Sequence, residues 1–394
     1  MRTLVISDLH LGSRGLRDVL RQPAALEALV AAVRRVDRLV LLGDVVELLE
    51  GRVAGALAEA EPVLRALGQA MEGGEVVVVP GNHDHLLVRA WLRQRRADQL
   101  PLGAATRVPQ DATESLAEVS AALRPRDGRV RVQYPGAWLA PHVYAHHGHY
   151  LDLHLASTPL ARIARAAGEG ALGPADAYEL GRTTSVAAAS LVVRDLPDAF
   201  EEGIERFTGL ARALGKALIA GGDNPRARAR AERIAPLGAD LLDRRLEAGG
   251  LEALRRVCAD LGVLPRARHV LFGHVHRLGP LNAEEALGPW HPDPDGPWLW
   301  NSGSWVHEPL LVSPQDVRAP YWPGGALLLE GERTPQVVRL LEDVPPERYV
   351  RQPRAVSAAA EEEDAGAGTP DDDPDLYDVD AEAELLGEDE DGGA

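Results

Sequence analysis

Five short motifs along the chain carry carboxylate, amide and imidazole side chains. In chain order they are Asp8-Leu9-His10, Gly43-Asp44, Gly81-Asn82-His83-Asp84, His147-Gly148-His149 and Gly273-His274-Val275-His276. Oxygen and nitrogen donors of these kinds are the ligands that divalent metal ions take from proteins. Two metal ions held side by side are a common device for hydrolysing phosphate esters. The motifs therefore indicate a hydrolytic enzyme.

Two of the motifs pair a histidine with a second ligand two residues away. Asp8 and His10 follow the apolar run 3–6, and His274 and His276 follow the run 269–272. Because alternate residues of an extended chain point to the same side, each pair is predicted to present both side chains to one face.

The middle motifs supply further ligands and a candidate catalytic group. The two carboxylate oxygens of Asp44 suit it to bridge two cations, and Asn82 offers a neutral carbonyl oxygen. The adjacent His83 and Asp84 are typical of an imidazole that a carboxylate orients. We predict His83 as the catalytic imidazole and Asp84 as its orienting partner.

Neighbouring residues compete for some of these roles. His147 is the preferred ligand of its motif, because it precedes the glycine, and His146 is the main alternative. Glu47 is predicted to accept a hydrogen bond near the site rather than to bind metal. Arg14 has the chemistry to contact a substrate phosphate, but among 41 arginines an ordinary surface role is favoured.

The motifs are positioned by alternating strands and helices. Apolar, β-branched runs predict strands at 3–6, 39–42, 76–79, 130–134, 142–145, 269–272, 298–300, 304–306 and 326–329. Amphipathic stretches predict helices at 24–36, 53–69 and 86–96. Each motif follows a strand, and ligands of α/β sheets bind where the carboxyl ends of several strands meet. An α/β fold with one site at that edge is expected.

The chain is predicted to divide into a catalytic body, an insertion and a tail. The body covers 1–345 and contains a helical insertion at about 151–265, with helices at 160–167, 197–213 and 240–261. Residues 346–394 form an acidic tail, which low hydropathy and like-charge repulsion predict to be disordered.

Charge and composition restrict the class of partner. The net charge is −18, but residues 357–394 alone carry −16, which leaves −2 for the rest of the chain. A nearly neutral body with an acidic tail has no net positive charge to attract a polyanion, which argues against a nucleic-acid substrate. A phosphorylated small molecule is expected instead. No apolar run is long enough for a transmembrane segment and no leader is evident, so a cytoplasmic protein is expected. The oligomeric state stays open.

The five motifs resemble the pattern of the calcineurin-like metallophosphoesterase superfamily, which is D-x-H, GD, GNH[DE], H and GHxH. The resemblance covers the body to about Leu340. It implies a four-layer α/β/β/α sandwich of two mixed sheets. It also implies one metal held by Asp8, His10, Asp44 and His276, and a second held by Asp44, Asn82, His147 and His274. His83 would be the catalytic imidazole.

The resemblance implies hydrolysis of a phosphate mono- or diester through a binuclear centre and a hydroxide that bridges the two metals. Nitrogen and oxygen ligands without thiolate suit Mn²⁺, Fe or Zn²⁺, of which we favour Mn²⁺. One alternative is a nucleotide-linked lipid pyrophosphohydrolase, because Ser7 to Gly12 and the insertion resemble the branch that includes UDP-diacylglucosamine pyrophosphohydrolase. A non-catalytic metal-binding scaffold is the other.

Overall fold

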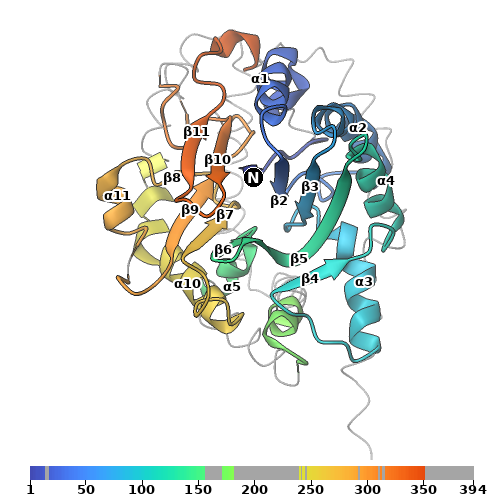
Figure 1. Ribbon diagram of the computed structural model, residues 1–394, viewed down its shortest axis with the longest axis vertical. Helices are drawn as coiled ribbons and strands as arrows, with labels where there is room; N and C mark the ends of the chain where they lie inside the picture. Colours follow the sequence, from blue (N-terminus) through green and yellow to red (C-terminus); the bar gives the residue numbers. More distant parts are fainter. Residues whose placement is uncertain are drawn as a thin grey trace, which may run out of the picture.

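The protein was analysed as a computed structural model, which describes nine ranges of the chain. They are residues 1–13, 17–155, 171–181, 239–240, 242–244, 246–291, 293–308, 311–312 and 316–350. Within these ranges the chain forms a mixed α/β fold around a large sheet (Figure 1). None of the helices in these ranges has the length and apolar character needed to cross a membrane.

The sheet of the described chain has eleven strands. Their bounds are β1 Arg2–Ile6, β2 Arg38–Leu42, β3 Glu75–Val79, β4 Ala105–Val108, β5 Arg129–Ala140, β6 Val143–His146, β7 His269–Phe272, β8 Leu278–Gly279, β9 Trp298–Ser302, β10 Gly325–Glu330 and β11 Gln336–Arg339. They pair in the order β11-β10-β1-β2-β3-β5-β6-β7-β9-β8, with β4 beside β5. Parallel pairs lie at the centre of each half, and antiparallel pairs lie at the edges and at the join.

Strand β5 joins the two halves of this sheet. Its first residues pair with β3, and its last residues, from Gly136 to Ala140, pair with β6. The two halves expected as separate sheets are therefore joined: one hydrogen-bonded path runs through ten of the described strands, and β4 pairs with β5 beside this path. The physical reason is the length of β5, which is long enough to belong to both halves.

Helices surround the sheet in two groups (Figure 1). The first half carries α1 Pro23–Val33, α2 Val53–Ala70, α3 Leu86–Ala97 and α4 Glu114–Ala122, and the second half carries α5 Asp152–Leu155, α10 Leu251–Asp260 and α11 Ala283–Leu287. Single-turn 3₁₀ helices occur at Val19–Arg21, His149–Leu151 and Pro346–Arg348, and a π-helix spans Leu246–Gly250.

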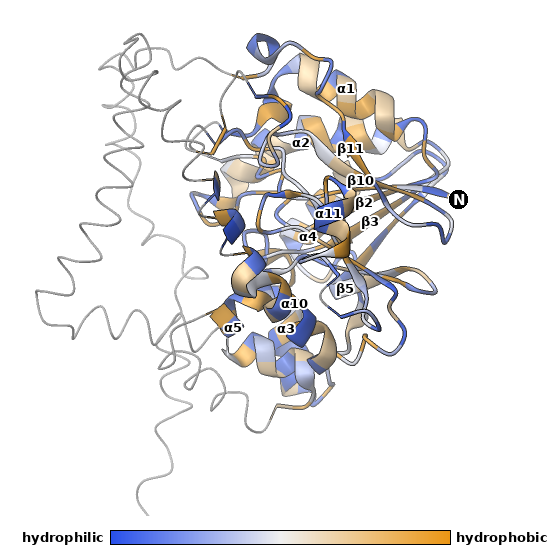
Figure 2. Cartoon of the chain, turned by 90° about the vertical axis from the view of Figure 1, so that its left-hand side faces the viewer, coloured by the Kyte–Doolittle hydropathy of each residue, from blue (hydrophilic) through white to orange (hydrophobic). Residues whose placement is uncertain are grey.

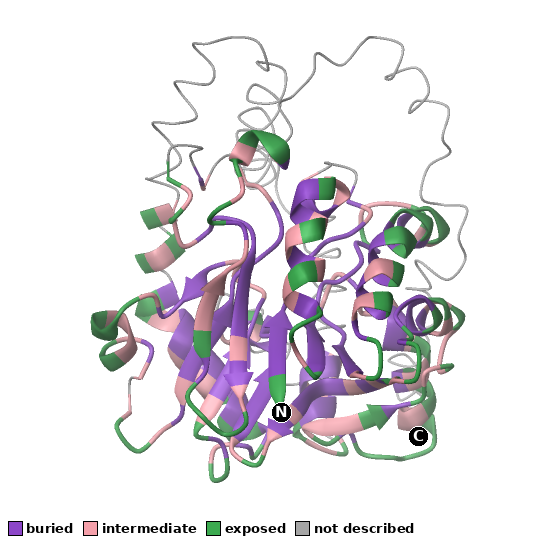
Figure 3. Ribbon diagram, turned by 45° about the horizontal axis from the view of Figure 1, so that its top comes forward, coloured by how far each residue is buried: buried purple, intermediate pink, exposed green. Residues whose placement is uncertain are grey.

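The pattern of apolar residues explains why each element forms. In α2, Ala56, Ala60, Val63 and Leu67 recur at helical spacing and are all buried, so one face of this helix packs against the core. Strands β2 and β3 are buried along their whole length, as expected of parallel strands covered on both faces (Figure 3). The same segregation is visible in the hydropathy of the chain, where the strands are largely apolar (Figure 2).

A second hydrophobic cluster connects the two halves of the sheet. It contains Val40 and Leu327 from the first half together with Ala145 and Leu271 from the second, all fully buried. Arg38, at the start of β2, adds a polar link: its guanidinium pairs with Glu75 at 2.7 Å and donates to the Leu139 carbonyl of β5 at 2.8 Å. The halves are thus held by apolar packing and by β5 itself.

Most predicted strands and helices of the described chain are present in the structure. Strand and helix positions agree to within a few residues through 3–146, although β5 is much longer than 130–134, and β4, α4, β8, α11 and β11 were not predicted. The predicted strand 304–306 is absent, because only a single bridge joins Asp18 to Val306. The predicted helices at 160–167 and 197–213 lie outside the described residues.

The boundaries of the insertion and tail are only partly visible. Within 151–265, residues 174–181 and α10 are helical, while the predicted 240–261 helix contains the π-turn at Leu246–Gly250. Tyr349 is 1% exposed and its hydroxyl accepts from Trp322 Nε1 at 2.9 Å, so the folded body continues past residue 345. The rest of the predicted tail, 351–394, lies outside the described residues.

We expect Leu327→Ala to destabilise the fold by about 2–5 kcal/mol, because it would open a cavity in the cluster between the halves of the sheet. The matched control is Leu287→Ala in α11, where the side chain is 71% exposed and a change within about 0.5 kcal/mol is expected. Chemical denaturation of the two variants measures both values. Equal losses would contradict the proposed importance of that cluster.

Candidate metal centre

The predicted site residues lie in loops that follow five strands of the sheet. Asp8 and His10 follow β1, Asp44 follows β2, and Asn82 and His83 follow β3. The remaining predicted ligands, His147, His274 and His276, follow β6 and β7. The first three strands belong to one half of the sheet and the last two to the other, so the candidate centre lies across both halves.

Left-handed backbone, rather than strand alternation, brings the paired ligands together. β1 ends at Ile6 and β7 at Phe272, so neither pair lies in a strand, which corrects the predicted reason for their convergence. The φ angles are 55° at Asp8, 44° at His10, 68° at His274 and 58° at His276. Non-glycine residues rarely adopt this conformation, and where it occurs it often marks a functional site.

Hydrogen bonds between neighbouring loops stabilise this conformation. The Asp8 amide donates to the Gly43 carbonyl at 3.0 Å, and the His10 amide donates to the Asp44 carbonyl at 2.9 Å. Asp44 also has a positive φ, 53°. The loops after β1 and β2 therefore continue the pairing of their strands beyond the sheet.

One group of candidate ligands contains Asp8, His10 and His276, whose ligand atoms all lie within 4.8 Å of one another. His276 Nε2 is 3.3 Å from Asp8 Oδ1 and 3.3 Å from His10 Nε2. Asp44 Oδ2 lies 3.8 Å from His10 Nε2. The same carboxylate oxygen is thus near this group and, as described next, near a second one.

The second group contains Asp44, His147 and His274, again with ligand atoms within 4.8 Å. His147 Nε2 is 3.1 Å from Asp44 Oδ2 and 3.2 Å from Asn82 Oδ1. Asn82 therefore lies beside this group. The structure brings all seven predicted metal ligands together, with Asp44 between the two sets.

Two ring nitrogens show that the histidines are oriented as metal ligands require. His147 Nδ1 lies 2.8 Å from the Leu42 carbonyl, and His10 Nδ1 lies 2.9 Å from Glu47 Oε2. Carbonyl and carboxylate oxygens only accept, so each Nδ1 carries a proton, and in the neutral ring Nε2 would offer its lone pair to a cation. A histidine held in this way by a carboxylate or carbonyl is the usual support of a metal ligand. The donor set fits divalent metal ions.

His83 is held by Glu47 and not by Asp84. His83 Nδ1 lies 2.7 Å from Glu47 Oε2, whereas the two oxygens of Asp84 accept the backbone amides of Gly81 and Val45 at 2.6 and 2.8 Å. The predicted orienting contact of Asp84 with His83 is therefore corrected. Two amides already occupy its carboxylate, which fixes the loop that carries Asn82 and His83.

His83 also belongs to a third, overlapping group with His10 and Asp44. Its ring lies edge-on to that of His10, with centroids 4.6 Å apart, and its side chain is 31% exposed. This exposure distinguishes it from the fully buried His147. The His83 side chain is also more exposed than those of His276 and His274, which are 22% and 15% exposed.

The electrostatics of the centre favour cations. Burial alone would raise the pKa of Asp44 and of Glu47, but the neighbouring histidines hold the pKa of Asp44 well below its usual range and lower that of Glu47 to about 2. Burial and the charge of Asp44 raise the pKa of Asp84 to about 6. Burial tends to lower the pKa of His83, yet the hydrogen bond that it donates to Glu47 and the charge of Asp44 raise this pKa above the ordinary value.

His146, the alternative to His147, faces away from the centre. Its Nδ1 accepts the Gly148 amide at 2.8 Å, and its ring packs against His149 and Tyr150. Burial and the charge of His147 lower the pKa of His146 to about 3. The geometry favours His147 as the ligand. Arg14 lies outside the described residues.

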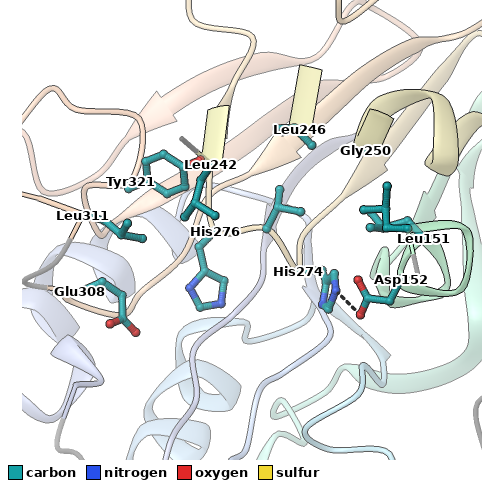
Figure 4. A pocket seen from close by; sticks show the side chains of 12 residues that line it. Leu151, Asp152, Leu242, Leu246, Gly250, His274, His276, Glu308, Leu311 and Tyr321 are labelled. Atoms are coloured by element: carbon teal, nitrogen blue, oxygen red, sulfur yellow. Dashed lines mark hydrogen bonds and ion pairs between the residues drawn. The ribbon is translucent and has the colours of Figure 1, made fainter. Parts of the chain in front are cut away.

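A pocket of about 570 Å³ opens beside His274 and His276 (Figure 4). Most of its wall is apolar and consists of Leu151, Leu155, Leu242, Leu246, Val275, Leu311 and Tyr321. Asp152, on the side of His274, lies 3.0 Å from that residue's Nε2, and Glu308 lies on the opposite side beside Leu311. No Lys or Arg is among the described residues that line it.

Sequence reasoning missed this pocket and the two carboxylates at its edges. Asp152 lies five residues after His147, and this closeness to a motif could have identified it. Glu308 and Leu311 lie far from any motif. The wall near His276 is fixed by Arg277, which pairs with Asp243 at 2.8 Å, and Asp243 in turn accepts the Tyr321 hydroxyl at 2.9 Å.

Comparison with known proteins supports the chemistry of the site. A family model described as Calcineurin-like phosphoesterase matches residues 1–163. This stretch contains four of the five motifs, and the last one, which begins at Gly273, lies beyond it. No curated protein matches the chain.

We expect Gly43→Ala to abolish metal binding at the group around His147, because an added methyl at this position would overlap the His147 ring. Gly73→Ala is the matched control: its φ is also positive, 72°, but no atom lies within 4 Å of the added methyl. Both variants bear the cost of a left-handed residue, about 1–2 kcal/mol. Elemental analysis of desalted, Mn²⁺-loaded protein measures the Mn²⁺ content of each variant. Equal content in both would contradict the expected loss in Gly43→Ala.

Proposed function

We propose that the chain hydrolyses phosphate esters through two divalent metal ions, a proposal supported by the calcineurin-like phosphoesterase family model that matches residues 1–163. The observation that carries this proposal is the convergence of two ligand groups on Asp44. Asp8, His10, Asp44 and His276 would hold one ion, and Asp44, Asn82, His147 and His274 the other. Mn²⁺ remains the favoured ion, with Fe and Zn²⁺ as alternatives suited to the same donors.

When bound, the two ions would supply a water of lowered pKa and would polarise the phosphoryl oxygens. The chain's own contribution centres on His83. Glu47 accepts from His83 Nδ1 and its carboxylate favours the protonated ring, so Nε2 is available to donate to a phosphoryl or leaving oxygen. Asp84 acts on the loop backbone and is proposed as a positioning residue rather than a catalytic one.

The pocket beside His274 and His276 supports a substrate with an apolar group next to its phosphate. An apolar wall binds such a group by removing it from water, at about 25 cal/mol per Å². The carboxylates of Asp152 and Glu308 would repel further phosphates. These features favour a small apolar phosphate ester over a nucleotide or a nucleic acid.

The lipid pyrophosphohydrolase alternative is supported by the leucines of this pocket. It is opposed by the lack of Lys or Arg in the described lining, since a nucleotide diphosphate needs cationic partners beyond two metal ions. The non-catalytic scaffold is opposed by the presence of His83 with its Glu47 partner. We retain the simpler phosphate ester, mono- or diester, as the substrate class.

We propose the domain division along with this function. The catalytic body, predicted as 1–345, would extend to residue 350 because Tyr349 is buried in it; the insertion at about 151–265 would interrupt it, and the acidic tail would follow from 351. The four-layer α/β/β/α arrangement is part of the same proposal, and the cluster that both halves of the sheet share supports it.

The proposed function predicts metal-dependent hydrolysis of p-nitrophenyl phosphate or its bis ester. Metal-stripped protein should be inactive and should recover with Mn²⁺, while His83→Ala should lower kcat by about 10²–10⁴-fold with its metal content unchanged. His142→Ala is the control, because this histidine binds the Arg266 carbonyl far from the centre. Full activity in His83→Ala would remove His83 from the reaction, and no activity in wild-type protein with both metals bound would favour the scaffold.

The apolar pocket predicts a dependence on chain length among unbranched alkyl phosphates, whose leaving groups differ little in acidity. We expect kcat/KM to rise by up to about fourfold per methylene until the pocket is filled. Leu242→Ser should flatten this rise while preserving activity on methyl phosphate, because Leu242 lines the pocket but is 39% exposed and lies outside the buried core. A flat series in the wild-type protein would contradict the assignment of the pocket to substrate.

A further inference from the structure

Glu179 is a buried carboxylate outside the motifs, in the segment predicted as the insertion. It lies in the helical residues 174–181 and is 4% exposed. Oε1 accepts the Tyr134 hydroxyl at 2.5 Å and also the Tyr150 hydroxyl, and Oε2 lies 2.8 Å from His85 Nε2. A carboxylate without such donors would be costly to bury, so these bonds are a condition of its position.

Two of the partners of Glu179, His85 and Tyr150, belong to loops that carry candidate metal ligands, and the third, Tyr134, lies in β5. His85 immediately follows Asp84 and precedes α3, so it ends the loop of Asn82 and His83. Tyr150 lies in the 3₁₀ turn His149–Leu151 directly after His147. The Asn82 and His147 side chains contact each other at 3.2 Å, and Glu179 joins the far ends of their loops.

Two further hydrogen bonds of this helical segment join it to residues outside the metal loops. Asp176 accepts the Leu102 amide at 2.8 Å, and the Tyr178 hydroxyl donates to Asp260 at 2.7 Å in α10. The Tyr178 ring also stacks on Tyr150, with centroids 4.6 Å apart. The bonds of Asp176 and Tyr178 to Leu102 and Asp260 thus anchor the segment to the body outside the metal loops, while Glu179 bonds to a residue of each loop.

We propose that Glu179 is a positioning residue for the metal group formed by Asp44, Asn82, His147 and His274. By accepting from both loops at once, it fixes the separation of Asn82 and His147. The helical segment 174–181 therefore helps to set the geometry of this metal group. This inference rests on the proposed function for the identity of the bound ion, but not on turnover.

The test compares Glu179→Ala and Glu179→Gln with Asp176→Asn in the full-length protein. Asp176→Asn is the matched control, since it weakens an anchoring bond of the same segment without touching the metal loops. Mn²⁺ binding by equilibrium dialysis and thermal unfolding are measured for each variant, together with kcat at saturating Mn²⁺.

We expect Glu179→Ala to weaken the affinity of one Mn²⁺ ion by about 10–100-fold and to leave the other unchanged. Glu179→Gln keeps an acceptor for both tyrosine hydroxyls, so it should restore much of that affinity. Asp176→Asn should lower the unfolding temperature without changing either Mn²⁺ affinity. kcat at full occupancy should fall for Glu179→Ala alone.

The inference would be overturned if Glu179→Ala bound both Mn²⁺ ions like the wild type, or if Asp176→Asn weakened Mn²⁺ binding equally. Should Glu179→Ala fail to fold, Tyr150→Phe provides the second variant, because it removes one donor to Glu179 while keeping the ring stacked on Tyr178. Unaltered Mn²⁺ binding in Tyr150→Phe would then overturn the inference. Wild-type protein that bound Mn²⁺ without hydrolysing any ester would refute the proposed function and leave the Mn²⁺ comparison decisive for Glu179.

Discussion

The turn at Gly43 and Asp44 holds the centre together. Its carbonyls accept the amides of Asp8 and His10, and the Asp44 carboxylate accepts the His83 amide at 2.9 Å and lies 3.1 Å from His147 Nε2. This density of contacts is possible only because Gly43 has no side chain. A methyl there would occupy the space of the His147 ring, because the Gly43 backbone and the His147 imidazole are in direct van der Waals contact.

The sheet topology supplies the loops that meet at this turn. Parallel strands release their polar loops at one edge, which gathers residues that are far apart in sequence. The left-handed residues then redirect the chain sharply within a few positions, so that the ligands of one loop converge on a small volume instead of diverging along the strand. The cost of this conformation is balanced by hydrogen bonds between the loops and by the surrounding core.

Much of this arrangement was predictable from short-range pattern. Apolar runs located β1, β2, β3 and β7 because fully buried parallel strands have continuous hydrophobic sequences. Motif order identified the seven candidate ligands that the structure brings together. The reason for their convergence did not follow from the sequence, because a positive φ at Asp8 or His274 depends on partners in other loops. The partner of His83 could not be predicted for a similar reason. Asp84 accepts the backbone amides of Gly81 and Val45, so its place beside His83 is taken by Glu47. Pocket residues such as Glu308 and Leu311 had no local signal at all.

Strand β5 has a consequence for how the molecule can move. Asp8 and Asp44 come from one half of the sheet, and His147 and His276 from the other, so any hinge between the halves would pull the ligand set apart. An unbroken strand shared by both halves, with apolar packing beside it, gives that hinge no flexible joint. With the proposed function, substrate and product would therefore pass over the rim near α5 and Leu246–Gly250, which lines the pocket, rather than through a hinge between the halves.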